Sequence, residues 1–298
     1  MLIVPWLWAV FTIIAAAAQT VRNATQRTLT TKLGTVGATH VRFLFGLPFA
    51  IVFLIGVTIV LGRDWPRPDP IYWIWVLDGA GAQFAATALM LAAMGERSFV
   101  VTIAYIKTEP ISVALFGLIL LGDQVSLLMA VAIVVATAGV VVTSVEPRAM
   151  AGGLRPTLMG LVSGALFGVS AIGFRGAILS LHDPSFVMAA TFTLVIGLAL
   201  QTVLLTLYLY LRAPHVLFAI FRVWRPSLFA GLMGALASQS WYLAFAIATA
   251  ASVRTLALVE VLFAQAISHF MFKQPTTRRE AVGIVMIVAG VVLLIWAY

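Results

Sequence analysis

The chain has no cysteine and very few charged residues. Without cysteine it can form no disulfide, no thiolate metal site and no thiol nucleophile. Only 9% of its 298 residues are charged and 62% are hydrophobic, whereas a soluble domain carries about 25% charged residues. A soluble protein must cover its surface with polar side chains. The deficit therefore excludes a water-soluble globule and predicts an all-α integral membrane protein.

Catalytic and cofactor motifs are also missing. The four histidines lie far apart and show no metal-ligand spacing: His40, His182, His215 and His269. There is no phosphate-binding loop, no dinucleotide fingerprint and no serine or zinc hydrolase signature. We therefore expect no enzyme activity, no metal and no cofactor, and the sequence argues against an ATP-driven pump.

The net charge of +8 does not indicate a nucleic-acid partner. The basic residues are scattered singly among apolar runs and form no patch with interleaved aromatic residues. In membrane proteins, Lys and Arg instead mark the cytoplasmic loops. The lipid bilayer is the partner that this composition predicts.

Long apolar runs divide the chain into spans. A helix needs about 20 apolar residues to cross the hydrocarbon, and the breaks between runs carry turn residues such as His182-Asp-Pro184. The run Met1–Ala18 has no basic segment before it, so we expect a first helix rather than a cleaved signal. About ten spans are predicted, at 3–21, 36–61, 71–94, 99–121, 125–145, 157–179, 184–211, 227–247, 251–272 and 278–298.

Five spans, a polar joint and five more spans suggest a duplication. The first five-helix repeat covers 1–145, the joint 146–156 and the second repeat 157–298. A shift of 151 residues places Glu109 on Glu260 and the glycine of Gly139-Val-Val-Val142 on Gly290. An odd number of spans per repeat gives the two repeats opposite orientations. Inverted repeats around a central cavity are typical of secondary transporters.

The distribution of basic residues predicts an orientation. Thirteen Lys and Arg lie in or beside the odd-numbered connections, and four lie in the even-numbered ones. By the positive-inside rule the odd connections are cytoplasmic. We therefore expect a multi-pass protein of a bacterial-type inner membrane with both termini on the periplasmic side.

The end of each predicted repeat resembles the EamA-type ten-helix transporters of the drug/metabolite transporter superfamily. The resemblance lies in an apolar helix, a short polar turn (GDQVS at 122–126, KQPTT at 273–277) and a Gly-Val-Val closing helix. Its strongest stretch is VEVLFAQAISHFMFKQPTTRREAVGIVMIVAGVVLLI at 259–295. As a hydropathy pattern it covers essentially the whole chain.

This resemblance implies two inverted five-helix repeats around a central cavity and, in many members, export of amino acids or other metabolites. The family pattern has an acidic residue in the turn before each closing helix. Asp123 matches it, whereas the second repeat has Lys273-Gln274. Many such transporters are thought to keep both termini in the cytoplasm, the reverse of what the charges of this chain predict.

Four charged residues inside predicted spans are the first candidates for a substrate or proton site, because ionisable groups in hydrocarbon are expensive and usually functional. Glu109 and Glu260 are equivalent under the repeat. A carboxyl in a dry site is protonated more readily than in water, which lets protons compete with substrate. Lys107 and Arg254 are candidates for holding an anionic group. Alternatively, the two cations simply neutralise the two glutamates, or Arg254 extends to the interface.

The run Lys107-Thr-Glu-Pro110 also predicts a broken helix, because Pro110 removes a backbone donor and kinks the helix. Asp78 lies about seven residues inside its span, too deep for a cap, and is a further candidate for the cavity. Gln239, Trp241 and Tyr242 are expected to form an aromatic wall with a polar group. The two rings are equally compatible with a place at the membrane interface.

Together these features predict a secondary active transporter that exports small polar metabolites, amino acids or related compounds, by alternating access and with coupling to protons. One alternative is uptake or exchange of an anionic, phosphorylated or nucleotide-linked solute. An alternative of another class is a non-transporting assembly partner or a lipid-handling protein. Ten spans suffice to enclose a cavity, so we expect a monomer.

Overall fold

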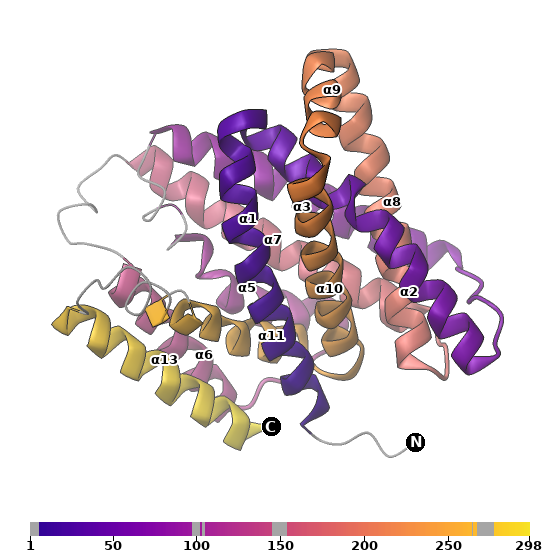
Figure 1. The fold of residues 1–298 in the computed structure, drawn as a ribbon. Coiled ribbons are helices and arrows are strands. Elements are labelled where there is room, and N and C mark those ends of the chain that lie inside the picture. Colours follow the sequence, from indigo (N-terminus) through magenta and orange to yellow (C-terminus); the bar gives the residue numbers. More distant parts are fainter. Residues whose placement is uncertain (1–5, 97–101, 103–104, 145–153, 264, 267–276) are drawn as a thin grey trace. The chain divides into compact units, whose positions relative to one another are not determined.

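The computed structural model describes residues 6–96, 102, 105–144, 154–263, 265–266 and 277–298, and all regular structure in these ranges is helical (Figure 1). The helices are α1 (Leu7–Leu44), α2 (Gly46–Leu61), α3 (Pro70–Glu96), α5 (Glu109–Phe116), α6 (Leu127–Ser144), α7 (Leu154–Ser180), α8 (Phe186–Arg212), α9 (Pro214–Arg222), α10 (Trp224–Ile247), α11 (Ala250–Leu256) and α13 (Arg278–Ala297). A π-helical turn, Gly117–Leu121, follows α5, and a 3-10 turn, Ala257–Val259, follows α11.

Several of these helices have the length and composition of membrane spans. Five segments in the described part of the chain are long and apolar enough to cross a membrane: Thr28–Leu61, Leu154–Ser180, Phe186–Arg212, Trp224–Ile247 and Arg278–Ala297. Shorter apolar helices occupy Glu109–Leu121 and Leu127–Thr143. The predicted all-α class with membrane-length helices is confirmed, while the count of ten spans stays a prediction.

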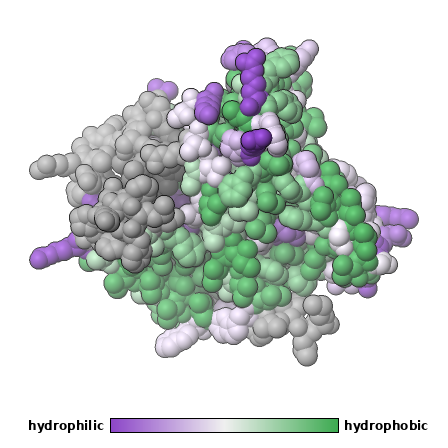
Figure 2. Space-filling model, in the orientation of Figure 1, coloured by the Kyte–Doolittle hydropathy of each residue, from purple (hydrophilic) through white to green (hydrophobic). Residues whose placement is uncertain are grey.

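The surface of these helices is unusually apolar. Val60 of α2 is 83% exposed, and Leu127, which begins α6, is also 83% exposed. Hydrophobic residues cover most of the described surface in view (Figure 2). Apolar patches of this kind normally mark surfaces that are in contact with lipid or protein rather than with water. The surface is therefore compatible with a membrane protein.

The chain forms two compact units that do not follow chain order. Unit 1 contains Met1–Val76 and Phe174–Ile247, and unit 2 contains Leu77–Gly173 and Ala248–Tyr298. The boundaries fall within α3 and α7, so each of these helices contributes residues to both units. Each unit also takes residues from both predicted repeats. The predicted repeats rest on internal sequence similarity, whereas the two units rest on contacts, so the units neither support nor contradict the repeat boundaries at 145 and 157. Most of the predicted joint, 146–156, lies outside the described residues.

The first connection differs from its prediction. Residues 22–35 were expected to join two spans, but helix continues from Leu7 to the break at Gly34, whose φ of 68° and ψ of 175° are non-helical. The chain reverses direction there, because the Gln26 side-chain amide donates to the Ala38 carbonyl at 2.7 Å. Leu29 and Val41, on either side of the break, pack in one buried cluster. Residues 7–33 and 35–44 therefore form a helical hairpin.

A second difference lies between the predicted seventh and eighth spans. Residues 212–226 were expected to be a connection, but α9 occupies Pro214–Arg222. Pro214 stands in the first turn of α9, where its missing N–H costs no helical hydrogen bond. Ile220 is fully buried in the same cluster as Leu209 of α8. Burial of this apolar face stabilises a helix that is too short to span a membrane.

In unit 2, α6 and α13 pack closely through glycines (Figure 1). A Cβ placed on Gly139 of α6 would lie 2.7 Å from the Gly283 carbonyl oxygen and 2.8 Å from the Ile287 nitrogen of α13. One placed on Gly290 of α13 would lie 2.6 Å from the nitrogen of Ala136. Only residues without a side chain allow backbones to approach this far.

These contacts also show the direction of the two helices. As the chain advances from Ala136 to Gly139 on α6, its contacts on α13 move back from Gly290 to Gly283 and Ile287, so the helices are antiparallel. The contacts are exchanged by the shift of 151 residues, because 139 corresponds to 290 and 136 corresponds to 287. Corresponding helices thus run in opposite directions and make equivalent contacts.

Candidate functional site

Four of the predicted site residues come together in unit 2. Lys107 lies in the turn before α5, and Glu109 is the first residue of α5. Arg254 lies in α11, and Glu260 follows the 3-10 turn at the end of that helix. Since α5 packs against α11, residues from opposite halves of the sequence meet at one place. These four residues form the charge cluster.

The first ion pair of the charge cluster joins Lys107 to Glu260, since the Lys107 Nζ contacts Glu260 Oε1. The side chains of Lys107 and Glu260 are 22% and 11% exposed. The described ion pair of Lys107 thus joins it to a glutamate from the other half of the sequence.

The second ion pair joins Arg254 to Glu109. The Arg254 Nε lies 3.0 Å from Glu109 Oε1, with side-chain exposures of 22% and 11%. The two atoms are within ion-pairing distance, and the attraction between opposite charges depends mainly on their separation.

The backbone is irregular on both sides of the charge cluster. The Thr108 N–H donates to the Tyr105 carbonyl at 3.2 Å, and the Ile111 N–H donates to the Thr108 carbonyl at 3.1 Å. These short-range bonds form the turn that the sequence predicted before Pro110. On the other side, the 3-10 turn Ala257–Val259 directly precedes Glu260. Broken helices at membrane depth occur where the backbone is buried in protein or lines a cavity.

The pairing is crossed between the two predicted repeats. Each glutamate pairs with the cation from the other half of the chain, and two positive charges balance two negative ones. Breaking one partner of a buried ion pair leaves an uncompensated charge, which costs about 3–5 kcal/mol. A molecule that offers a carboxylate and an ammonium together carries charges complementary to both kinds of group in the charge cluster.

The ion pairs of the charge cluster do not include Asp78. It lies in α3 and is exposed, and a Cβ on Gly173 of α7 would be 2.9 Å from its Oδ2. Within the described residues it makes no ion pair with Lys107 or Arg254. Its predicted role as a cavity residue has no further support.

Gln239, Trp241 and Tyr242 lie on α10 in unit 1, which is not the unit of the charge cluster. The Gln239 amide donates to the Thr191 hydroxyl at 2.8 Å, and the Trp241 indole N–H donates to the side-chain Oε1 of Gln19 at 3.3 Å. Both rings are buried.

The Trp241 ring stacks 6.4 Å from Phe245, and the Tyr242 ring lies 5.2 Å from Phe174. The two aromatic side chains therefore pack among helices of their own unit.

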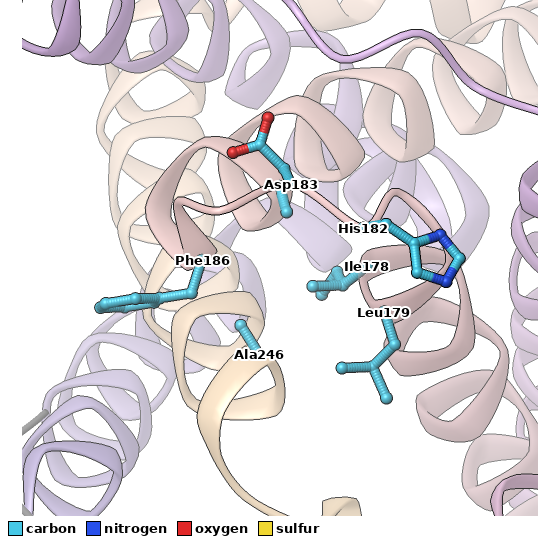
Figure 3. Close-up of a pocket in the computed structure, with 7 residues that line it drawn as sticks. Ile178, Leu179, His182, Asp183, Phe186 and Ala246 are labelled. Carbon is cyan, nitrogen blue, oxygen red and sulfur yellow. The ribbon is translucent and has the colours of Figure 1, made fainter.

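A pocket that the sequence did not predict lies at the turn between α7 and α8. Its volume is about 90 Å³, and it is lined by Ile178, Leu179, His182, Asp183, Phe186, Ala189 and Ala246 (Figure 3). His182 has a left-handed φ of 49°, and Asp183 accepts a hydrogen bond from the Ser185 N–H at 2.7 Å. The His-Asp-Pro sequence predicted the turn but not the pocket. None of the eight predicted site residues lines it.

Among the described side chains, no group of three or more His, Cys, Asp or Glu is placed to hold a metal ion. The chemistry that this arrangement offers is ion pairing through carboxylates, a guanidinium and an ammonium. These groups can bind charged solutes and exchange protons, but they provide no activated nucleophile.

Comparison with known proteins identifies the fold but not a family. No protein-family model and no curated protein matches the chain. A solved structure described only as "Crystal structure of protein" is similar with a TM-score of 0.71, over 96% of this chain and 98% of that chain, at 15% sequence identity. At this identity the likeness shows a shared fold and says nothing about what either protein does.

Proposed function

We propose that this chain is a ten-span membrane transporter that exports small zwitterionic metabolites, of the amino-acid class, by alternating access. The five membrane-length helices and their exposed apolar side chains support membrane insertion. The proposal implies a transporter of the EamA type.

The observation that carries the proposal is the crossed pairing of the charge cluster. A zwitterion brings one carboxylate and one ammonium, so it can take the place of both partners in an exchange of ion pairs. Its carboxylate would bind Arg254 or Lys107, and its ammonium would bind Glu109 or Glu260. Charges stay balanced before and after binding, which avoids the cost of an unpaired charge. A solute with a single charge would leave one protein group uncompensated.

The antiparallel packing of α6 and α13 supports the alternating-access part of the proposal. Equivalent helices in opposite directions provide two related states, one open to each side of the membrane. The crossed ion pairs join α5 and α11, which belong to the two predicted repeats. Movement of one repeat against the other would therefore act directly on these pairs.

Proton coupling follows from the same groups. Protonation of Glu109 would release Arg254, and protonation of Glu260 would release Lys107. Each released cation would then be available for the carboxylate of the substrate. Uptake of a proton and binding of the substrate are linked in this scheme, because both act on the same ion pair.

Counterflow in proteoliposomes tests the proposal. Purified protein is reconstituted, and a labelled panel of neutral amino acids, organic acids, organic amines and sugar phosphates is followed with and without a pH gradient. We expect saturable flux of one or more amino acids that changes with the gradient. The amide and the decarboxylated analogue of the same amino acid, which each lack the carboxylate, should compete poorly.

Other results would change the proposal in defined ways. Saturable flux of phosphorylated or other anionic solutes alone would replace it with anion uptake or exchange. Folded protein that moves no member of the panel would contradict transport of these solutes and favour a non-transporting partner.

A further inference from the structure

Helix α9 joins the ends of two membrane-length helices. α8 ends at Arg212 and α10 begins at Trp224, and both helices are long and apolar enough to cross a membrane. The backbone leaves helical geometry at both ends of α9, at Ala213 (φ −153°, ψ 61°) and at Val223 (φ −109°, ψ 37°). α9 is therefore a separate helix at the end of α8 (Figure 1). In a membrane it lies where two candidate spans reach the boundary of the bilayer.

One face of α9 is covered by the protein. Val216 lies against α1, because a Cβ on Gly37 would be 2.7 Å from Val216 Cγ1. Ile220 is fully buried in the cluster that includes Leu209 of α8 and Leu29 of α1. Val216 and Ile220 are four residues apart and so share one face of the helix. This face holds α9 against the rest of unit 1.

The opposite face of α9 is apolar as well, but it is exposed. Phe218 is 72% exposed and Phe221 is 60% exposed. Phe218 stands two residues from both Val216 and Ile220, which is about 200° around the helix, so it points away from the buried face. A helix face in contact with water normally carries polar residues. Two exposed phenylalanines indicate an apolar environment beside this face.

The apolar surface continues from α9 onto both neighbouring helices. Tyr210 and Leu211 of α8 and Trp224 and Phe229 of α10 are all exposed. Tyrosine and tryptophan are enriched where a membrane meets water. The exposed face of α9 is therefore continuous with the surface of two candidate spans. The environment that suits such a continuous surface is lipid.

Three basic residues lie around this apolar surface. Arg212 ends α8, Arg222 ends α9 and Arg225 lies in the first turn of α10, and all three are exposed. Arg222 follows Phe218 by four residues, so the two share the exposed face of α9. The Arg225 guanidinium lies 5.5 Å from the centre of the Trp224 ring. Positive charges thus stand directly beside the exposed aromatic rings.

The helices around α9 contain no acidic residue. The chain has no Asp or Glu from residue 184 to residue 259, a stretch that includes all of α8, α9 and α10. Helix α1, which also packs against α9, has none either. The surface around α9 is therefore positive as well as apolar, and its charge is complementary to an anion.

We propose that α9 is an interfacial helix that binds the headgroups of anionic phospholipids. Its binding surface consists of Phe218, Phe221, Arg212, Arg222 and Arg225, and we call it the α9 lipid surface. The two phenylalanines lie at the boundary between headgroups and acyl chains, as the apolar side of an interfacial helix does. The arginines bind the phosphates of the headgroups. The proposal rests on insertion of the chain into a membrane and is independent of what the chain transports.

The combination of rings and charges selects this class of lipid. A soluble anion would use the arginines but not the exposed phenylalanines, and a lipid without net charge would use the phenylalanines but gain little from the arginines. An anionic phospholipid uses both. Because the arginines are exposed, salt should weaken their contribution.

A spin label at Phe218 tests the location of α9. The chain has no cysteine, so Phe218→Cys carries a single thiol. The full-length protein is labelled with a nitroxide and reconstituted into vesicles, with a water-soluble nickel chelate on both sides. We expect high accessibility to oxygen and low accessibility to the chelate. Asp64→Cys, in the connection between α2 and α3, is the control and should show the reverse.

Two results of this measurement would overturn the proposal. Access of the chelate to the Phe218→Cys label would place the exposed face of α9 in water. A label that neither oxygen nor the chelate reaches would show that protein, rather than lipid, covers that face.

A fluorophore on the same thiol measures the preference for anionic lipid. Its quenching by brominated phosphatidylglycerol is compared with quenching by brominated phosphatidylcholine, each at the same mole fraction in phosphatidylcholine vesicles. We expect phosphatidylglycerol to be preferred near the label by about fivefold or more, with a smaller preference at high salt. Equal quenching by the two lipids at low salt would overturn the proposal.

Replacement of the arginines connects this preference to the α9 lipid surface. Arg212→Gln, Arg222→Gln and Arg225→Gln, each combined with Phe218→Cys, should lower the preference by about two- to fivefold, and the three together should abolish it. Arg222→Lys should keep it, because the charge remains. Arg63→Gln, in the connection before α3, is the control and should leave it unchanged. If the triple variant does not fold, the single variants carry the test. A preference that survives unchanged in the Gln variants would overturn the proposal.

Discussion

At the scale of single residues, the charge cluster brings together two positive and two negative groups. Lys107 binds Glu260 and Arg254 binds Glu109, with all four side chains less than one quarter exposed. In an environment of low dielectric, each charge depends on its partner much more than it would in water. Under the proposed function, the same dependence is what lets a zwitterionic substrate compete for both partners.

A double-mutant cycle measures this dependence. Lys107→Met leaves Glu260 without its ion pair and should destabilise the protein by about 3 kcal/mol. Glu260→Gln added to Lys107→Met removes the uncompensated charge, so the double variant should be more stable than Lys107→Met alone. Tryptophan fluorescence during denaturation reports the stabilities.

The matched control for this cycle is Glu280→Gln combined with Lys107→Met. Glu280 lies in the capping box of α13, where Gln can replace Glu, and it makes no described contact with Lys107. Its effect should simply add to that of Lys107→Met. Additive effects of Lys107→Met and Glu260→Gln would contradict the ion pair.

The sequence singled out the charged residues of the cluster as candidates but did not predict which of them pair. Charge inside an apolar run and equivalence under the 151-residue shift marked Glu109 and Glu260. The crossed pairing depends on the contact between α5 and α11, which no local pattern encodes. For the same reason, the sequence did not show that Trp241 and Tyr242 belong to the other unit.

At the scale of helices, the pair α6 and α13 is fixed by backbone contact at glycines. Gly139→Ala and Gly290→Ala each place a Cβ within 2.8 Å of backbone atoms that cannot move aside easily. Each change should therefore cost about 1–3 kcal/mol of stability. Because the positions are equivalent, the two costs should be similar.

Gly56→Ala in α2 is the control, since a Cβ there has no neighbour within 4 Å. Helix propensity alone should make this change neutral or stabilising by up to about 1 kcal/mol. Denaturation of the three variants in detergent gives the comparison. Tolerance of Ala at Gly139 or Gly290 would contradict the close antiparallel packing.

Helix positions were predictable where apolar runs end at turn residues. The break at His182-Asp-Pro184 separates α7 from α8 as expected. The first connection does contain the chain reversal, at Gly34, but its helical state was not predicted, because most residues from Gln19 to Lys32 are polar and resemble a loop. Several of its threonines donate to carbonyls three or four residues earlier, as Thr20 does to Ala16 at 2.8 Å. Packing of Leu29 and Leu33 then overrides the weak local preference.

At the scale of the whole molecule, the orientation in the membrane is open to a direct test. The protein has no cysteine, so a single introduced thiol is the only one that a maleimide can label. Asp64→Cys lies in the connection between α2 and α3, and Arg222→Cys lies at the end of α9. The positive-inside bias predicts that the first faces outward and the second faces the cytoplasm.

In intact bacterial cells, a membrane-impermeant maleimide should label Asp64→Cys and should label Arg222→Cys only after permeabilisation. The reverse pattern would show that both termini face the cytoplasm. Equal labelling of both thiols in intact cells would contradict the predicted spans between them.

Composition was sufficient to predict the class of the whole molecule. With 9% charged residues the chain cannot cover a soluble surface, and membrane-length helices are what the structure shows. The division into units was not predictable, because it follows contacts between distant segments such as Met1–Val76 and Phe174–Ile247.

The central claim is that the crossed ion pairs bind the transported solute, and amino-acid counterflow through the two glutamate variants tests it most directly. Glu109→Gln and Glu260→Gln are compared with wild type and with Glu280→Gln in proteoliposomes at matched protein content. The account predicts that each of the first two variants loses most of its saturable, pH-dependent flux, at least about tenfold, while Glu280→Gln keeps it. Undiminished flux in Glu109→Gln and Glu260→Gln, from folded protein, would contradict the account.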